Sequence, residues 1–304
     1  MKIAVTGGAG FIGSHLVEKL VYKGDNVVVL DSLWSGKLDN LAKVFQKIKF
    51  TDVDVRENGK LLGSLEDVDA VVHLAALTSV QESIVMPLLY QEVNATGTLN
   101  VLNKSVKVGV KKFIFISSAA VYGNPIEKSI NENHPTKPLS PYAASKLKAE
   151  EYCRSYSRMG KISITILRLF NVYGPRQSYS QYSAVITQFI DKIKNNQQPI
   201  IFGDGEQVRD FVYVGDVVEY ISKAIESGIQ DTINIGTGTE TTINQLAQLV
   251  ARISKKSHIT PLYHPAKEGD IRYSKADISK AIKTLGYIPK TTLEEGLKKT
   301  IDAN

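Results

Sequence analysis

The feature that most constrains the fold is a repeated alternation of short apolar runs with longer amphipathic segments. The runs are rich in Val and Ile and read, in chain order, KIAVTG, NVVVLD, IKFTDVDV, AVVHLA, KFIFISS and ISITILRLFN. Continuous apolar runs of this length are typical of parallel strands, because helices cover both faces of such a sheet. The alternation therefore predicts an α/β fold built on a doubly wound parallel sheet.

The segments between these runs predict helices at Phe11–Tyr22, Leu38–Ile48, Met86–Lys107 and Tyr142–Arg158. After NVYGPR the composition changes to a stretch rich in Tyr, Ser and Gln, which indicates a smaller C-terminal α/β domain for the substrate. RDFVYVGDVVEYISKAI and TINIGTG look like a helix and a strand that return to the sheet. We expect a first domain of residues 1–171 plus about 212–236, and a second of about 172–211 and 237–304.

Composition excludes several classes of protein. The chain has 304 residues, of which 43% are hydrophobic, so it can bury a large core. The single cysteine, Cys153, excludes an internal disulfide and is interpreted as a packing residue. The five histidines show no metal-ligand spacing, so no metal site is expected. The formal charge of +6 comes with scattered lysines and no basic tract interleaved with aromatic residues, so nucleic-acid binding is not expected.

The N-terminus leads directly into KIAVTGG without an apolar leader and cleavage site. The chain also lacks a run of about 18 apolar residues, the length that a membrane-spanning helix needs. We therefore expect no membrane association and a cytoplasmic location.

A glycine-rich turn directly follows the first predicted strand. TGGAGFIGSH places Gly7, Gly10 and Gly13 at intervals of three residues, immediately before a helical segment. Glycine allows a tight turn and lets backbone amides approach a pyrophosphate, which the positive end of the helix attracts. Such a turn between a strand and a helix predicts a dinucleotide site of the Rossmann type.

An acidic residue ends the next predicted strand. Asp31, in VVVLDSLWSG, is placed to bind the ribose hydroxyls of an adenosine. Its carboxylate would repel a 2′-phosphate, and Ser32 and Leu33 supply no cation to attract one. NAD is therefore preferred over NADP as the cofactor, although the nearby Lys37 leaves the alternative open.

The stretch SPYAASK places Tyr142 and Lys146 four residues apart where a helix is expected to begin. In a helix this spacing brings both side chains to one side. Since the chain has 14 tyrosines, chance should produce about one such pair. A second pair, Tyr263 and Lys267, does occur, but it encloses Pro265 and need not be helical. A cation at Lys146 would lower the pKa of Tyr142 toward the working range.

Together these motifs resemble those of a known family. TGGAGFIGSH, Asp31, DVR, HLAA, VNATGT, SSAAVYG, SPYAASK, RLFNVYGPR and GDGEQVRDFVYVGDV stand in the order typical of extended short-chain dehydrogenase/reductases. The resemblance covers nearly the whole chain and is greatest to the nucleotide-sugar epimerases. It implies an NAD-dependent enzyme that epimerises a UDP-hexose at C4 through a 4-keto sugar, with UDP-glucose and UDP-galactose as the expected pair.

The resemblance implies that Ser118, Tyr142 and Lys146 are catalytic. In the family this set removes a proton from a sugar hydroxyl while hydride passes to the nicotinamide. From local sequence alone, Ser117 is an equal candidate, and the family motif favours Ser118 because it directly precedes AAVYG. A serine at a strand end also commonly caps a turn.

The resemblance also implies the cofactor contacts, in which Asp54 and Val55 flank the adenine and Phe170 packs near the nicotinamide. The residues expected to contact NAD are Gly7, Gly10, Phe11, Ile12, Gly13, Asp31, Ser32, Asp54, Val55, Leu74, Ala75, Ala76, Asn94, Tyr142, Lys146 and Phe170. Apolar members of this set are also interpreted as core residues. His73 is interpreted as a structural residue and not as a catalyst.

For a UDP-sugar substrate the resemblance implies contacts from Thr78, Ser118, Tyr142, Asn171, Arg209, Lys267 and Asp270. Arg209 resembles the diphosphate-binding arginine of the family. Lys267 replaces the usual arginine of an R-x-G-D segment, which substitutes a point charge for a bidentate contact. Arg272 is placed to compensate for this change, and a surface salt bridge is the alternative explanation for either cation. Ser274 is small at the position that gates the 2-substituent of the sugar, which permits N-acetyl sugars.

The two residues after Ser118 separate the sister reactions of the family. The 4,6-dehydratases carry Asp-Glu there and the UDP-glucuronate decarboxylases carry Glu second, whereas this chain has Ala119 and Ala120. Alanine transfers no proton, which argues against both reactions. Another epimerase, acting on UDP-glucuronate or a dTDP-sugar, remains the alternative enzyme, and an NAD-sensing regulator is the alternative outside enzymes. The family also implies a homodimer that pairs the helices at 86–107 and 142–158.

Overall fold

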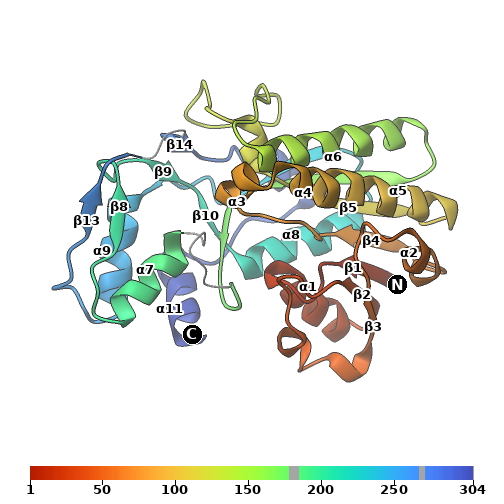
Figure 1. The fold of residues 1–304 in the computed structure, drawn as a ribbon, viewed down its shortest axis with the longest axis horizontal. Helices are drawn as coiled ribbons and strands as arrows, with labels where there is room; N and C mark the ends of the chain where they lie inside the picture. The colour runs from red at the N-terminus through yellow and green to blue at the C-terminus, as the bar shows by residue number, and fades with distance from the viewer. Residues whose placement is uncertain (178–184, 267–270, 304) are drawn as a thin grey trace.

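The computed structural model describes residues 1–177, 185–266 and 271–303. Its centre is a sheet of seven parallel strands in the order β11-β6-β5-β4-β1-β2-β3 (Figure 1). In chain order these strands are β1 (Lys2–Thr6), β2 (Asn26–Asp31), β3 (Ile48–Asp52), β4 (Ala70–His73), β5 (Lys112–Ser118), β6 (Ser163–Leu169) and β11 (Thr232–Ile235). The predicted doubly wound parallel sheet is confirmed, and β11 joins it beside β6, as the TINIGTG pattern indicated.

Helices cover both faces of the sheet. One face carries α1 (Phe11–Tyr22) and α8 (Val214–Ser227), and the other carries α2 (Asn58–Ser64), α5 (Gly97–Lys107) and α6 (Pro141–Arg158). Successive residues of β1 alternate between the two cores, since Ile3 and Val5 pack under α1 and Ala4 packs on the opposite side. Both faces of the strand are therefore buried, which explains its continuous apolar sequence.

The helix predicted at Phe11–Tyr22 is confirmed as α1. Helix α6 begins one residue before the predicted Tyr142 because Ser140 caps it, with Ser140 Oγ accepting a hydrogen bond of 3.1 Å from the amide of Ala143. Pro141 occupies the first helical position, where a missing N–H costs nothing.

The helix predicted over Leu38–Ile48 is wrong. This segment forms only two short 3₁₀ turns, η1 (Leu38–Leu41) and η2 (Phe45–Lys47), before β3 begins. Its contacts run to the glycine-rich turn, since the side-chain amide of Asn40 donates to the carbonyl of Ala9 at 2.9 Å. The segment is therefore attached to the glycine-rich turn and does not pack one continuous apolar helix face on the sheet.

The helix predicted over Met86–Lys107 begins one residue later and is not uniform. Met86 has φ −125° and ψ 55°, outside the helical region. Helix α4 (Pro87–Tyr90) then leads through a π-helical stretch, η3 (Gln91–Thr96), into α5. π-helical turns often lie at functional sites, and this one contains Asn94, a predicted cofactor contact.

The remaining elements gather mainly at one end of the molecule, on the left in Figure 1. Three small sheets pair β7 (Asn171–Tyr173) with β10 (Phe211–Tyr213), β9 (Val208–Arg209) with β12 (Thr241–Thr242) and β14 (Tyr273–Ser274), and β8 (Ile200–Phe202) with β13 (Leu262–His264). The helices here are α7 (Val185–Lys194), α9 (Ile243–Ile253) and α11 (Leu293–Ala303), which share a core of their own. The residue boundaries of the two expected domains stay a prediction.

Three short elements complete the described chain: α3 (Val80–Val85), η4 (Ala119–Tyr122) and α10 (Ser279–Leu285). Within the described ranges, none of the helices is long and apolar enough to cross a membrane.

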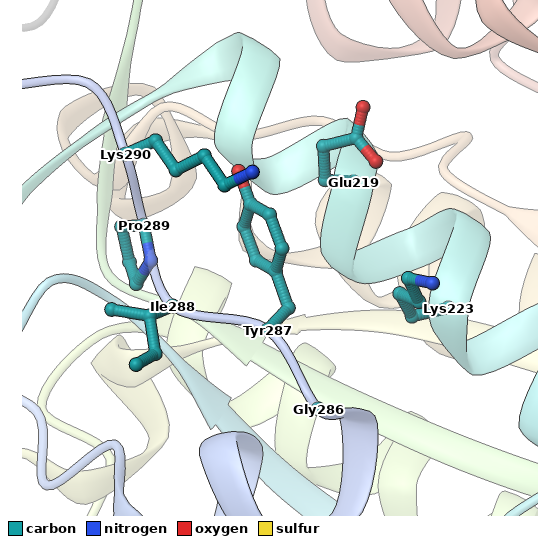
Figure 2. A pocket seen from close by; sticks show the side chains of 7 residues that line it. All are labelled: Glu219, Lys223, Gly286, Tyr287, Ile288, Pro289 and Lys290. Carbon is teal, nitrogen blue, oxygen red and sulfur yellow. The ribbon is translucent and has the colours of Figure 1, made fainter.

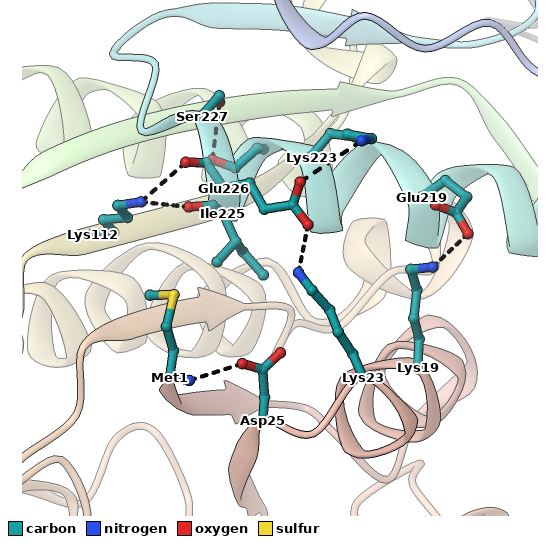
Figure 3. A network of polar contacts seen from close by, with 11 residues as sticks. Met1, Lys19, Lys23, Asp25, Lys112, Glu219, Lys223, Ile225, Glu226 and Ser227 are labelled. Carbon is teal, nitrogen blue, oxygen red and sulfur yellow. Dashed lines mark hydrogen bonds and ion pairs between the residues drawn. The ribbon is translucent and has the colours of Figure 1, made fainter.

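Ion pairs join α1 to α8 on the face that both helices cover (Figure 3). Lys19 pairs with Glu219, and Lys23 pairs with Glu226. These side chains are 30% to 43% exposed, so solvent screens the pairs in part and they add little to stability. The apolar side chains beneath them hold the two helices on the sheet.

Candidate active site

In the glycine-rich turn between β1 and α1, the backbone packs closely against itself and against the loop after β4. Gly7 has φ +69°, and a Cβ atom on it would lie 2.7 Å from the amide nitrogen of Ala75. A Cβ atom on Gly13 would lie 2.1 Å from the carbonyl oxygen of Gly7. Helix α1 has no side-chain cap and no acidic residue in its first turn, which includes the predicted contacts Phe11 and Ile12. Its N-terminus therefore suits an anionic group.

Asp31, at the end of β2, lies beside this turn. Its Oδ2 accepts from the amide of Ala9 and its Oδ1 from the amide of Leu33, both at 2.8 Å. Burial raises the pKa of this carboxyl. An ionised carboxylate has about four acceptor sites, so two bonds to the backbone leave capacity for ribose hydroxyls. Ser32 and Lys37 are exposed nearby.

Asp54, after β3, is bound by a residue that the sequence reasoning did not single out. Arg56 donates to its carboxylate from Nε at 3.0 Å and from Nη2 at 2.7 Å, and these bonds lower the pKa of Asp54. Arg56 stands two residues after Asp54 in the DVR motif, and this short separation could have indicated the ion pair. Val55 is buried, and a Cβ atom on Gly97 of α5 would lie 2.5 Å from its side chain.

Asn94 ties the loop after β4 to helix α6. Its Oδ1 accepts from the amide of Leu77 at 2.8 Å, and its Nδ2 donates to the carbonyl of Leu77 at 2.9 Å and to Ser145 Oγ at 3.0 Å. Asn94 thereby fixes the loop that contains the predicted contacts Leu74, Ala75 and Ala76, which are partly buried, and Thr78, which is exposed.

His73 lies beneath this loop as a neutral structural residue. Thr98 Oγ1 donates to the carbonyl of Asn94 at 2.6 Å, so it accepts from His73 Nε2, 2.9 Å away. His73 Nδ1 then accepts from Thr6 Oγ1 at 2.7 Å. Burial lowers the pKa of His73 to about 3, so the ring stays neutral. The structural interpretation of His73 is confirmed.

The two serines at the end of β5 point to opposite sides, as successive strand residues do. Ser117 is buried, and its Oγ donates to Glu150 Oε1 at 2.6 Å. Ser118 accepts from the amide of Ala120 at 3.2 Å, and its side chain acts to lower the pKa of Tyr142. Ser118 therefore caps the η4 turn and also meets the tyrosine.

Tyr142 and Lys146 lie one turn apart on α6, and both are buried. Burial raises the pKa of Tyr142, and the side chain of Ser118 acts against that increase. Lys146 Nζ donates to the carbonyl of Ile116 at 2.8 Å and lies 5.0 Å from the ring centroid of Phe115. Burial lowers the pKa of Lys146 to about 8. The predicted Ser, Tyr and Lys residues therefore come together where β5 meets α6.

Phe170 and Asn171 mark the transition from β6 to β7. Phe170 is buried in a cluster with Val121 and Tyr122. The backbone amide of Asn171 donates to the carbonyl of Asp210 at 3.0 Å. Asn171 therefore begins the small β7–β10 sheet beside the chain segment that contains Arg209.

The predicted diphosphate residues lie on short strands. Arg209 Nη1 donates to the carbonyls of Val208 at 2.8 Å and Ile271 at 2.6 Å. Ser274, on β14, is paired with Arg209 in the register of β9 and β14. Arg272 forms an ion pair of 2.6 Å with Asp204, with side chains 54% and 59% exposed, as the surface salt-bridge alternative requires. Lys267 and Asp270 lie outside the described residues.

Asp210 is a structural residue that the sequence reasoning did not single out. It is fully buried and accepts from the amide and hydroxyl of Thr237, and from the amides of Gly238 and Ala276. It thereby joins the turn after β11 to the segment after β14. Asp210 is the one acidic residue in the largely apolar RDFVYV segment, and this pattern could have indicated a buried carboxylate.

A separate surface hollow of about 640 Å³ opens beside α8 (Figure 2). Its lining includes Glu219, Lys223 and Lys290, with Tyr287 donating a hydrogen bond to the buried Asp216. None of the predicted site residues lines it, so it is distinct from the site at β5 and α6. Among the described residues, no group of three or more His, Cys, Asp or Glu side chains is arranged to hold a metal ion.

Known proteins resemble this chain in sequence and fold along nearly its whole length. The model of the GDP-mannose 4,6 dehydratase family matches residues 4–300. A UDP-glucose 4-epimerase from Thermotoga maritima, solved with UDP-glucose, is 41% identical, with a TM-score of 0.95 over 100% of this chain and 98% of that one. The chain belongs to the NAD-dependent epimerase and dehydratase family. A UDP-glucose 4-epimerase from Thermus thermophilus, solved with NAD, is 36% identical, with a TM-score of 0.91 over 100% of this chain and 98% of that one.

Family members that are similarly identical to this chain are named for different reactions. The dTDP-D-glucose 4,6-dehydratase of Mus musculus is 36% identical over 316 residues, which cover 99% of this chain and 88% of that protein. The protein is therefore an enzyme of the epimerase and dehydratase family with NAD as its cofactor. The residues present fit NAD, because Gly7 and Gly13 leave no room for a side chain in the turn and Asp31 offers carboxylate acceptors beside it.

Proposed function

We propose that this protein is a UDP-hexose 4-epimerase that interconverts UDP-glucose and UDP-galactose. The observation that carries the proposal is the pair Ala119 and Ala120, directly after Ser118. Ala120 packs on the cluster that contains Tyr142, and Ala119 packs on the cluster that contains Phe170. Neither side chain can transfer a proton, so the pair supports reversible oxidation at one carbon.

By resemblance, the sister enzymes that eliminate water carry acids at both positions, and those that eliminate carbon dioxide carry an acid at the second. Overall identity does not separate the reactions, since an epimerase and a dehydratase are both 36% identical to this chain. The residues directly after Ser118 are therefore better evidence for the reaction than overall identity to any relative.

In the proposed mechanism Tyr142 takes the proton of the C4 hydroxyl, and Ser118 holds that hydroxyl by a hydrogen bond. Held by the glycine-rich turn and Asp31, NAD would supply the acceptor and donor for the C4 hydride, which would return to the other face of the 4-keto sugar. Lys146 is protonated below its pKa of about 8, and its charge would favour the Tyr142 phenolate electrostatically. Tyr142 returns its proton to the C4 oxygen, so the residue ends each cycle as it began.

Arg209 is proposed to bind the diphosphate, for which a planar guanidinium is suited. Ser274, opposite Arg209 in the β9–β14 register, is proposed to leave room for an N-acetyl group at C2. The proposed substrates therefore extend to UDP-N-acetylhexosamines. The expected homodimer stays a prediction.

The test is to incubate the purified protein, without added NAD, with a panel of UDP- and dTDP-sugars and to follow the C4 configuration by NMR. We expect UDP-glucose and UDP-galactose to equilibrate without accumulation of NADH. A product that lacks the C6 oxygen or C6 carbon would contradict the proposed reaction. Turnover restricted to UDP-glucuronate or a dTDP-sugar would contradict the proposed substrate, and binding of NAD without any turnover would favour a regulatory protein.

A further inference from the structure

Helix α6 carries a buried carboxylate that the proposed mechanism does not use. Glu150 follows Lys146 by one turn and is fully buried. Its Oε1 accepts from Ser117 Oγ at 2.6 Å and from Arg168 Nε at 2.9 Å. Its Oε2 accepts from Arg168 Nη2 at 2.6 Å and from Arg154 Nη2 at 2.5 Å. Both carboxylate oxygens are therefore engaged twice.

Glu150 is charged in this position. Burial alone raises its pKa, but the hydrogen bonds and charge of Arg168, with help from Ser117 and Arg154, bring it below its ordinary value. Arg168 stands on β6, and its side chain is only 3% exposed. A buried ion pair of this kind often adds no net stability over apolar packing, so stability does not by itself explain it.

The contacts of Lys146 and Glu150 attach α6 to two successive residues of β5. Lys146 reaches the carbonyl of Ile116 at 2.8 Å, and Glu150 receives the hydroxyl of Ser117 at 2.6 Å. The next residue of the strand is Ser118, and Tyr142 stands one turn before Lys146 on the same side of α6. The two attachments therefore set the position of Ser118 relative to Tyr142.

We propose that Glu150 is a positioning residue, which ties Ser117 on β5 and Arg168 on β6 to α6 and so holds Ser118 in register with Tyr142 and Lys146. This inference rests on the proposed function, since it assigns Glu150 a part in that reaction. Displacing reacting groups by about 1 Å can cost about a hundredfold in rate, so such an attachment bears on turnover.

Glu150 also supplies the negative charge among the groups that influence the pKa of Lys146. Cys153 and Glu150 both act to raise the pKa of Lys146 against burial, but burial also raises the pKa of the Cys153 thiol, which stays neutral. His73, on β4, is neutral because burial lowers its pKa to about 3. Tyr142 is the titratable group one turn before Lys146 on α6, and Arg168 faces this region from β6 in its pair with Glu150.

The first test replaces Glu150 with Gln, which keeps an acceptor oxygen for Ser117 but removes the charge. Titration of ¹³C-labelled lysine side chains by NMR, with Lys146 assigned from Lys146→Arg, reports the midpoint directly. We expect the Lys146 midpoint to fall by about one pH unit, and the alkaline limb of the kcat/KM profile to fall with it. An unchanged midpoint in folded Glu150→Gln would overturn the inference about charge.

The matched control is Glu151→Gln on the same helix. Glu151 is exposed and pairs with Lys148, so its replacement should leave the Lys146 midpoint in place. An equal shift in both variants would overturn the assignment to Glu150, because a general change in helix charge would then explain it.

The second test is Ser117→Ala, which removes the attachment from the strand side without leaving Arg168 unpaired and so stays informative where Glu150→Gln does not fold. We expect kcat to fall by about tenfold to a hundredfold while KM and the retained NAD stay near wild type. Wild-type kcat in Ser117→Ala would overturn the positioning role.

A failure of the proposed function is recognised separately. If wild type epimerises none of the sugars offered, that proposal fails, while the Lys146 midpoint, read by NMR without substrate, still decides whether Glu150 sets the charge state of the site.

Discussion

The two sides of the candidate site are built in different ways. On the side of β5, β6 and α6, Tyr142, Lys146 and Glu150 are buried and engaged by other protein groups. On the side of β9 and β14, the candidate residues stand on strands of only two residues, and the cation Arg272 forms an exposed pair with Asp204. The first side is part of the core of the sheet, and the second lies on short surface strands.

This difference matches the demands of the two tasks. Proton and hydride transfer requires groups held within a few tenths of an ångström, which a packed helix and sheet provide. Selection of a sugar or diphosphate tolerates changes on short connecting segments. Relatives at similar identity are named for different reactions, and the resemblance places that difference at Ala119 and Ala120, directly after Ser118 on the first side.

The largest effect should come from the buried side, with Tyr142→Phe. Loss of the hydroxyl removes the proposed proton acceptor, so turnover should fall by about 10²- to 10⁴-fold. The ring still packs edge-on against Tyr90, so the variant should fold and keep its bound NAD. Steady-state kinetics and the absorbance of released cofactor measure both. Wild-type turnover would remove Tyr142 from this role.

A smaller effect is expected for Asp31→Ser, which removes the carboxylate proposed to bind the ribose. Charge-assisted hydrogen bonds of this kind correspond to about a tenfold to hundredfold loss of NAD affinity. Calorimetric titration of cofactor-stripped protein with NAD and NADP measures the loss, and the preference for NAD should shrink. Asp39→Ser is the control, because Asp39 is an exposed acid in the following turn. Equal losses in the two variants would contradict the assignment.

On the other side of the site, Arg209→Lys should raise the KM for the UDP-sugar by about tenfold while kcat changes by less than about threefold. A point charge replaces the planar guanidinium, whereas the catalytic groups stay in place. Initial-rate kinetics separate the two constants. A fall in kcat at constant KM would contradict a binding role and would make the two sides of the site less distinct.

The smallest effect is expected for Arg272→Gln. Its ion pair with Asp204 is exposed and screened, so the unfolding midpoint should stay almost unchanged and KM should change by less than about twofold. Thermal unfolding and the same kinetic assay measure these quantities. A rise in KM equal to that of Arg209→Lys would show that Arg272 contacts substrate, as the compensation hypothesis requires.

Local patterns predicted the elements that local physics controls. The central strands, α1 and α6 follow from apolar runs and helical spacing, which involve residues close together in the chain. The helix expected over Leu38–Ile48 failed because its contacts go to Ala9, in the distant glycine-rich turn. The spacing of apolar residues within a segment does not indicate a contact with a residue far away in the sequence.

The sequence by itself determined the parallel sheet, the glycine-rich turn, the acid after β2 and the linear Ser, Tyr and Lys motif. Only the tertiary structure decided that Ser117 turns to Glu150 while Ser118 meets Tyr142, and that Arg168 pairs with Glu150. The physical reason is that strand and helix periodicity act between near neighbours. A buried charge finds its partner only when the crossovers bring β5, β6 and α6 together.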